Sequence, residues 1–261
     1  MATSQWKRTT SNEDGIHWVI KPGDGLLKSG SFLRINIPAG KTEAINTDSM
    51  EMVFCIIAGA CKIKVNGQAF ECKKLDSVYA PFNSKVAIMA FDEPVILYVP
   101  AAESDKKISP YKTVFDMNMP IGDRKQVHGE GVARRDVFMT IAPQDQACRI
   151  IAGYTWGQEG MWTSWPPHQH EEHLEEVYVY FDMPENQFGL NLVFNDDLSD
   201  FYAHKVKSGD LVAMPSGYHP TVAAPGVKNT YLWALFAHNP ATDRRYDLAQ
   251  MHPNIGQQKM P

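Results

Sequence analysis

Several features that would place this chain in a special class of protein are missing from its sequence. No apolar run approaches the ~18 residues of a membrane-spanning helix. The N-terminal segment MATSQWKRTTSNEDG lacks the apolar core of a secretory signal. The net charge is −5, and no stretch concentrates the Lys and Arg residues that a nucleic-acid surface requires. We therefore expect a soluble, cytoplasmic protein with neither a membrane nor a nucleic acid as partner.

Cysteine is also scarce. The four cysteines, Cys55, Cys61, Cys72 and Cys148, form no CxxC pair, so neither a thiolate zinc site nor a disulfide framework is indicated. A chain of 261 residues buries enough apolar surface to fold without disulfides. The hydrophobic fraction of 44% and the charged fraction of 21% are ordinary for globular proteins and argue against disorder.

Long amphipathic helical patterns are nearly absent as well. Short apolar runs rich in β-branched and aromatic residues recur instead, separated by Gly, Pro, Asn and Asp. Asn66-Gly67 lies between two such runs and predicts a tight hairpin turn. Many short strands at regular spacing are typical of a sandwich or barrel, so we predict an all-β fold.

A polar segment divides the chain into two β-rich parts. Residues 106–135 are rich in charge, Gly and Pro, and we interpret them as a connecting segment. The predicted domains are therefore an N-terminal domain over 1–105 and a C-terminal domain over 136–261, the latter ending in a polar arm.

A weak internal repeat links the two parts. The segments 75–85 (LDSVYAPFNSK) and 209–219 (GDLVAMPSGYH) both have the pattern of a strand, a proline-bounded turn and a second strand. The paired landmarks are Asp76 with Asp210, Pro81 with Pro215, and Lys85 with His219. The repeat predicts a duplicated fold in which only the second copy kept its chemistry, the first having a structural or dimer-forming role.

The residues most typical of a chemical site lie in the second part. His168 and His170 alternate, so in a strand they project from the same face. Glu176 leads the next apolar run, and His219 follows much later in the chain. Imidazole and carboxylate ligands without thiolate suit Zn, Fe, Mn, Ni or Co in an open site rather than a closed structural zinc site. We predict that these four side chains hold one divalent metal ion.

Glu175 is the alternative to Glu176 as a ligand. Neighbouring residues of a strand face opposite sides, so only one of the two faces the metal, and the register of EVYVYF favours Glu176. The same parity puts Tyr178 beside Glu176, and we predict these two as catalytic residues. Five of the remaining histidines are interpreted as ordinary polar residues: His17, His128, His204, His238 and His252. His173 is expected in the loop between the two strands.

With these residues in place, the chain resembles the cupins, which are jelly-roll β-barrels. The spacing G-x5-P-x-G-x2-H over 209–219 resembles the second cupin motif, and His168-x-His170 followed by glutamate resembles the first. The commoner cupin gap fits Glu175. Longer stretches, WTSWPPHQH, LEEVYVYF and GYHPTVAAPG, resemble the bicupin sugar isomerases, the family of 5-deoxy-glucuronate isomerase and 4-deoxy-5-hexosulose-uronate ketol-isomerase. The resemblance implies two cupin domains in one chain, with metal in the second only.

The resemblance also implies a function. It indicates a metal-dependent aldose–ketose isomerase of an acidic hexose, most closely 5-deoxy-glucuronate isomerase of inositol catabolism, acting as a homo-oligomer with Zn or Mn. The metal would polarise the carbonyl and stabilise the enediolate. The alternatives are an isomerase of a hexuronate, a deoxy-hexosulose-uronate or a sulfonated hexose, a metal-dependent cupin dioxygenase, and a sugar-sensing or storage cupin. The last is disfavoured because storage cupins often lack the ligand set and no DNA-binding helical pattern is present.

An acidic substrate also requires a cation. Arg134, Arg135, Arg149 and Lys205 are the candidates, although a solvated surface position is the commoner role for each.

Overall fold

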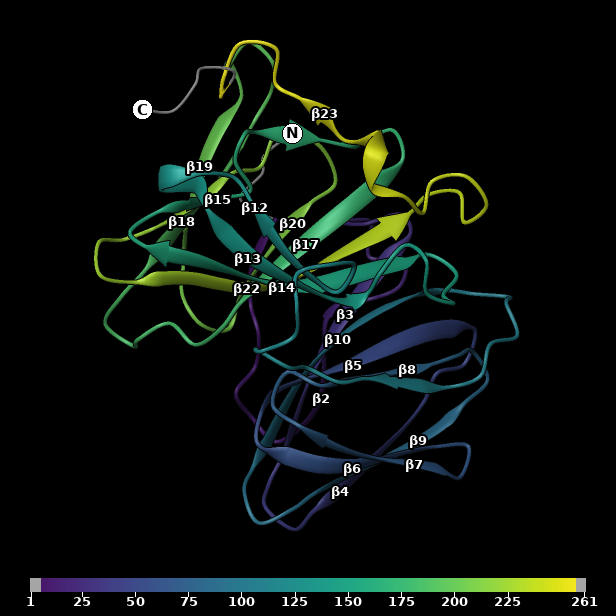
Figure 1. The fold of residues 1–261 in the computed structure, drawn as a ribbon. Coiled ribbons are helices and arrows are strands. Elements are labelled where there is room, and N and C mark those ends of the chain that lie inside the picture. The colour runs from purple at the N-terminus through teal and green to yellow at the C-terminus, as the bar shows by residue number, and fades with distance from the viewer. Residues whose placement is uncertain (1–5, 257–261) are drawn as a thin grey trace.

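The computed structural model describes residues 6–256, and over that range it consists of β-strands, turns and two short 3-10 helices, η2 (Gly131–Ala133) and η3 (Tyr246–Leu248). The predicted all-β fold is confirmed. Figure 1 shows two β units stacked on one another, the first in purple and blue and the second in teal to yellow. No helix of the described range is long and apolar enough to cross a membrane.

The first unit combines a six-stranded and a four-stranded sheet. The six-stranded sheet has the order β11 (Tyr111–Thr113), β8 (Ser77–Ala80), β5 (Met50–Ala58), β10 (Val95–Glu103), β3 (Gly30–Ile37) and β2 (Gly15–Ile20). The four-stranded sheet has the order β4 (Thr42–Asn46), β9 (Lys85–Ala90), β6 (Ala60–Val65) and β7 (Gln68–Lys73). Asn66 and Gly67 join β6 to β7 with φ values of 49° and 89°, which confirms the predicted hairpin.

The second unit repeats this construction. Its seven-stranded sheet has the order β1 (Lys7–Thr9), β20 (Asp210–Met214), β17 (Leu174–Tyr180), β22 (Lys228–Ala237), β14 (Ile150–Glu159), β13 (Arg135–Ile141) and β12 (Lys125–His128). The four-stranded sheet has the order β15 (Trp162–Thr163), β21 (Thr221–Ala223), β18 (Gly189–Phe194) and β19 (Phe201–Val206). A separate ribbon pairs β16 (His168–Gln169) with β23 (Gln250–Met251).

The two large sheets pack against each other through a core that both units share. Phe32 and Tyr98 of the first unit belong to the same buried cluster as Tyr154 and Phe236 of the second. Gly30 is required at this contact, because a Cβ atom there would lie 2.3 Å from the Phe236 ring. The shared core fixes the second unit on the first (Figure 1).

Two buried glutamates join the units reciprocally. Glu51 of β5 accepts hydrogen bonds from the backbone N–H groups of residues 148–150 in the second unit. Glu175 of β17 accepts them from the N–H groups of residues 28–30 in the first. One edge strand crosses over as well: β1, which precedes the first unit in sequence, pairs with β20 of the second. The domain limits 1–105, 106–135 and 136–261 stay a prediction.

Candidate metal centre

The four predicted ligands lie together in the second unit. One donor atom from each of His168, His170, Glu176 and His219 can be chosen so that all lie within 4.8 Å of one another. His170, Glu176 and His219 are buried, and His168 is half-buried. Two distant parts of the chain, residues 168–176 and His219, therefore bring one set of nitrogen and oxygen donors to a single point.

Strand register places each of these side chains. On β17, Tyr178 and Tyr180 pack inside the second unit, whereas Val177, Val179 and Phe181 pack on the opposite face, in the core shared with the first unit. This alternation is the predicted one, and it turns Glu176 inward. β16 is held by β23 of the C-terminal segment, with His168 opposite Met251.

Backbone carbonyl groups orient the three imidazole rings. Nδ1 of His168 bonds to Pro166 O at 3.2 Å, and Nδ1 of His170 bonds to Leu174 O at 2.9 Å. Nδ1 of His219 bonds to Gly217 O at 2.8 Å. A carbonyl oxygen only accepts, so each Nδ1 carries the proton and each Nε2 presents a lone pair, the tautomer of a metal-binding histidine.

The donor atoms approach one another more closely than lone pairs tolerate without a cation. Glu176 Oε2 lies 3.2 Å from His170 Nε2 and 2.9 Å from His219 Nε2. The His219 nitrogen is buried and is not aligned for a hydrogen bond with any described residue. A buried, unsatisfied acceptor beside a carboxylate is costly. The donor set therefore fits a divalent ion.

The electrostatics keep the cluster in its metal-binding protonation state. Burial, and then the neighbouring His219 and His170, lower the pKa of His168 to about 3. Burial raises the pKa of Glu176, but the adjacent imidazole groups of His170 and His219 outweigh it and bring the pKa to about 2. At neutral pH, His168 is thus uncharged and Glu176 is ionised, as ligation requires.

Glu175 lies outside the cluster. Its carboxylate faces the first unit and accepts N–H groups there, Ser29 and Gly30 among them. The two neighbouring glutamates thus have separate partners, one at the interface between the units and one among the histidines.

A cavity of about 290 Å³ opens onto the cluster. Tyr178 lines it, and its hydroxyl donates to Ser164 Oγ at 3.0 Å. Burial raises the pKa of Tyr178 well above its ordinary value, so the phenol is a neutral hydrogen-bonding group. Gln126 and His128 of β12 and Tyr246 from the C-terminal segment also line the cavity. Sequence reasoning missed these residues, since their sequence neighbours carry no motif.

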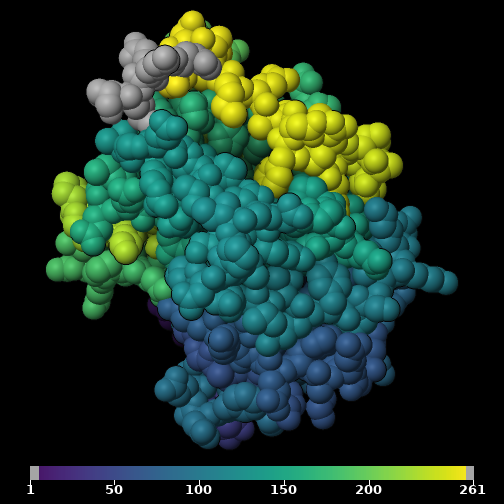
Figure 2. Space-filling model, in the orientation of Figure 1, coloured from purple at the N-terminus to yellow at the C-terminus, as the bar shows by residue number. Residues whose placement is uncertain are grey.

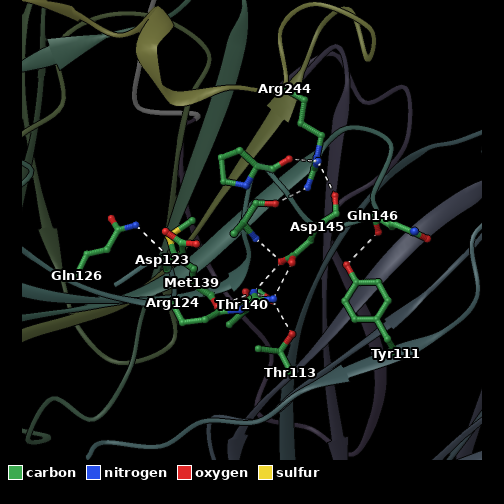
Figure 3. A network of polar contacts seen from close by, with 12 residues as sticks. Tyr111, Thr113, Asp123, Arg124, Gln126, Met139, Thr140, Asp145, Gln146 and Arg244 are labelled. Carbon is green, nitrogen blue, oxygen red and sulfur yellow. Dashed lines mark hydrogen bonds and ion pairs between the residues drawn. The ribbon is translucent and has the colours of Figure 1, made fainter. Parts of the chain in front are cut away.

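One loop anchors both of these lining segments. Asp145 accepts two hydrogen bonds from Arg124, just before β12, each 2.6 Å long. Arg244 precedes Tyr246 and donates to the carbonyl groups of Ala142 and Asp145 and to two others. Figure 3 shows Asp145 between the two arginines. Figure 2 shows the C-terminal segment, in yellow, lying on the surface of the second unit.

Of the four candidate cations, the structure brings one to the cavity. Arg135 lines it. Arg134 is exposed and lies 3.6 Å from Asp136, and Lys205 is exposed on β19. Arg149 donates to backbone carbonyl groups at the interface between the units.

Comparison with known proteins adds independent information. The model of the KduI/IolB family matches residues 5–253. A protein of Geobacillus thermodenitrificans named 5-deoxy-glucuronate isomerase is 29% identical over 240 residues, 85% of each chain. Its namesake in Bacillus subtilis strain 168 is 28% identical over 245 residues, 86% of this chain and 83% of its own.

Solved structures show the same fold. An IolB-like protein from Salmonella typhimurium LT2 superposes with a TM-score of 0.80 at 22% identity, covering 90% of this chain and 94% of its own. Oxalate decarboxylase superposes with a TM-score of 0.64 at 12% identity, covering 90% and 77%. These similarities bear out the predicted fold class of two cupin domains in one chain.

Proposed function

Because the chain belongs to the KduI/IolB family, we propose that it is a metal-dependent aldose–ketose isomerase of an acidic hexose, most closely 5-deoxy-glucuronate isomerase. The observation that carries the proposal is the cluster of three histidines and Glu176 beneath a cavity, in a chain matched by the family over nearly its whole length. The relatives named 5-deoxy-glucuronate isomerase support the substrate class.

Within this proposal the residues have distinct roles. His168, His170, Glu176 and His219 hold one divalent ion. When bound, the ion supplies Lewis-acid stabilisation of the negative charge that develops on the two substrate oxygens. A pKa of about 2 makes Glu176 a weak base, so we assign it to holding the ion rather than to proton transfer. The Tyr178 hydroxyl, held at Ser164, orients the substrate.

The finer assignments belong to the same proposal. Zn or Mn is the favoured ion, inositol catabolism the process, the cytoplasm the compartment and a homo-oligomer the working form. The donor set equally suits an isomerase of another anionic sugar, such as a hexuronate, or a cupin dioxygenase with iron. The names of the relatives favour the isomerase.

Metal analysis and an NMR assay test the proposal. The purified protein is expected to contain one divalent ion per chain and to convert 5-deoxy-glucuronate into the corresponding ketose. A panel of hexuronates, a deoxy-hexosulose-uronate and a sulfonated hexose ranks the alternatives, and oxygen uptake reports a dioxygenase. A metal-loaded protein that leaves every acidic sugar unchanged would falsify the isomerase.

A further inference from the structure

Arg135 differs from Arg244 in how its guanidinium is satisfied. Its Nη1 donates to Ala133 O at 3.2 Å and to Trp165 O at 2.8 Å. Among the described residues, Nε and Nη2 have no hydrogen-bond partner, and Arg135 forms no ion pair. Arg244, by contrast, uses three nitrogens on carbonyl groups. The Nε and Nη2 edge of the Arg135 guanidinium is therefore available to a ligand.

Arg135 is one of the residues that line the cavity beside the cluster. Arg135 is half-buried and lines the cavity together with Tyr178 and Tyr231. Its Nε and Nη2 atoms are not among the buried polar atoms left without partners, so both keep some exposed surface. Gly129 lies against the same carbonyl group: a Cβ atom there would first meet the Ala133 carbonyl and would also lie 3.1 Å from Arg135 Nη1.

Charge in the cavity is distributed between two places. Among the described residues that line it, Glu176 is the only acid and Arg135 the only group with a permanent positive charge. Burial and the proximity of Arg135 lower the pKa of His128, so this neighbour is uncharged at neutral pH. With a divalent ion offsetting Glu176, the cavity has an excess of positive charge at both places, which suits a dianionic transition state.

The spacing between the two positive centres fits a short acid. The carbonyl groups of two neighbouring residues bind the two side chains concerned. Trp165 O accepts a hydrogen bond from Arg135, and Pro166 O accepts one from the metal ligand His168. The guanidinium and the imidazole therefore lie on the order of 10 Å apart or less. That separation is comparable with an extended six-carbon acid together with one metal bond and one hydrogen bond.

We propose that Arg135 binds the carboxylate of an acidic sugar whose other end reaches the histidine cluster, and that it selects anionic over neutral substrates. This inference rests on the proposed function. A guanidinium with two free N–H groups on one edge is suited to bidentate binding of a carboxylate. Because the carboxylate is remote from the reacting carbons, the contact stabilises ground state and transition state alike and acts on KM rather than on kcat.

The test compares Arg135→Gln with Arg134→Gln in the metal-loaded full-length protein. Gln keeps an N–H donor for Trp165 O but removes the charge, and Arg134 is the adjacent exposed arginine. D-glucuronate and D-glucose are titrated by calorimetry as an anionic and a neutral probe. We expect Arg135→Gln to weaken glucuronate binding about 10- to 100-fold, the value of a charged hydrogen-bonded contact, and to leave glucose binding unchanged. Arg134→Gln should match the wild type.

Three outcomes overturn the proposal: a wild type that prefers glucose, an Arg135→Gln variant that binds glucuronate normally, and an equal loss for both sugars. Arg135→Lys, which restores a charge, should recover part of the glucuronate affinity; a Lys variant no better than Gln also counts against the proposal. Turnover of 5-deoxy-glucuronate by the wild type is scored separately. An inactive protein with Arg135-dependent glucuronate binding refutes the isomerase only, and an active one with an unchanged Arg135→Gln KM refutes the carboxylate contact only.

Discussion

The two units of this chain share a framework but differ in what fills it. Inside the first unit, Met52, Phe54 and Ile88 belong to a buried apolar cluster. Inside the second, the corresponding space holds histidines, Glu176 and tyrosines around a cavity. Among the described residues, the group in the second unit is the only cluster able to hold a metal.

Sheet register shows which positions correspond. Met52 pairs with Ala80, the residue before Pro81, and Glu176 pairs with Met214, the residue before Pro215. Since the two prolines are landmarks of the repeat, Met52 occupies the place of Glu176. The preceding residue is glutamate in both copies, and in both it joins the units. Both copies of the fold therefore keep the glutamate that joins the units, Glu51 and Glu175. The next residue differs between them: it is Met52 in the first unit and Glu176 in the second.

The largest expected effect on activity comes from replacing His219 of the second unit with the lysine found at the equivalent position, Lys85, of the first. Lys85 is exposed at the start of β9, whereas its counterpart His219 is 1% exposed in the cluster. His219→Lys should lower isomerase activity at least about a thousandfold and abolish metal binding, because an ammonium group offers no lone pair and repels the ion. Metal content by mass spectrometry and turnover by NMR measure both effects.

The reciprocal exchange is the control. Lys85→His should leave one ion per chain and normal activity, because Met52 and the apolar interior supply no second ligand. Full metal occupancy in His219→Lys, or a second ion in Lys85→His, would show that the two units differ for another reason.

A smaller and symmetric effect is expected at the two interface glutamates. Glu51→Ala and Glu175→Ala each leave three backbone N–H groups without their charged acceptor. Each should lower the free energy of unfolding by about 3 kcal/mol, measured by urea denaturation followed by tryptophan fluorescence. The exposed Glu172→Ala variant serves as the control.

The metal content of two variants distinguishes the interface residue Glu175 from the cluster residue Glu176. Glu175→Gln should retain the ion, and Glu176→Gln should lose it, because only Glu176 approaches the histidines. Loss of metal in Glu175→Gln with retention in Glu176→Gln would reverse the assignment of the two neighbours.

Local patterns predicted much of this comparison from the sequence. Alternation along EVYVYF turns Glu176 inward, and the HxH spacing brings His168 and His170 to one side, because both depend only on the geometry of a strand. The Pro and Asp landmarks identified the repeat. The tight turn at Asn66 and Gly67 followed from residues that tolerate positive φ.

Features that depend on tertiary packing were not predictable. The reciprocal binding joins Glu51 to residues 98 positions away and Glu175 to residues 146 positions away, and nothing near either one indicates its partner. His128 was interpreted as an ordinary polar residue, yet it lines the cavity because Arg124 is bound to Asp145. Four arginines and lysines were equivalent in sequence, and only the packing of β13 directs Arg135 to the cavity.

The smallest expected effect compares two turn glycines with the same backbone conformation. Gly67 has φ of +89° with open space around its Cβ position, and Gly217 has φ of +87° with Phe194 O at 3.1 Å. Alanine at either position should cost about 1 kcal/mol of unfolding free energy, since left-handed φ strains a side chain. Only Gly217 also binds a cluster residue, because its carbonyl accepts from His219 Nδ1.

Equal backbone strain should therefore have unequal consequences for function. Gly217→Ala should weaken metal affinity about 10- to 100-fold, the usual effect of disturbing a group that orients a ligand, whereas Gly67→Ala should leave it unchanged. Competition with a fluorescent chelator measures the affinity, and urea denaturation measures the stability. If both variants lose stability but bind metal normally, the carbonyl of Gly217 does not orient His219. The second unit would then tolerate the same strain as the first, because its ligands would be held by the strands alone.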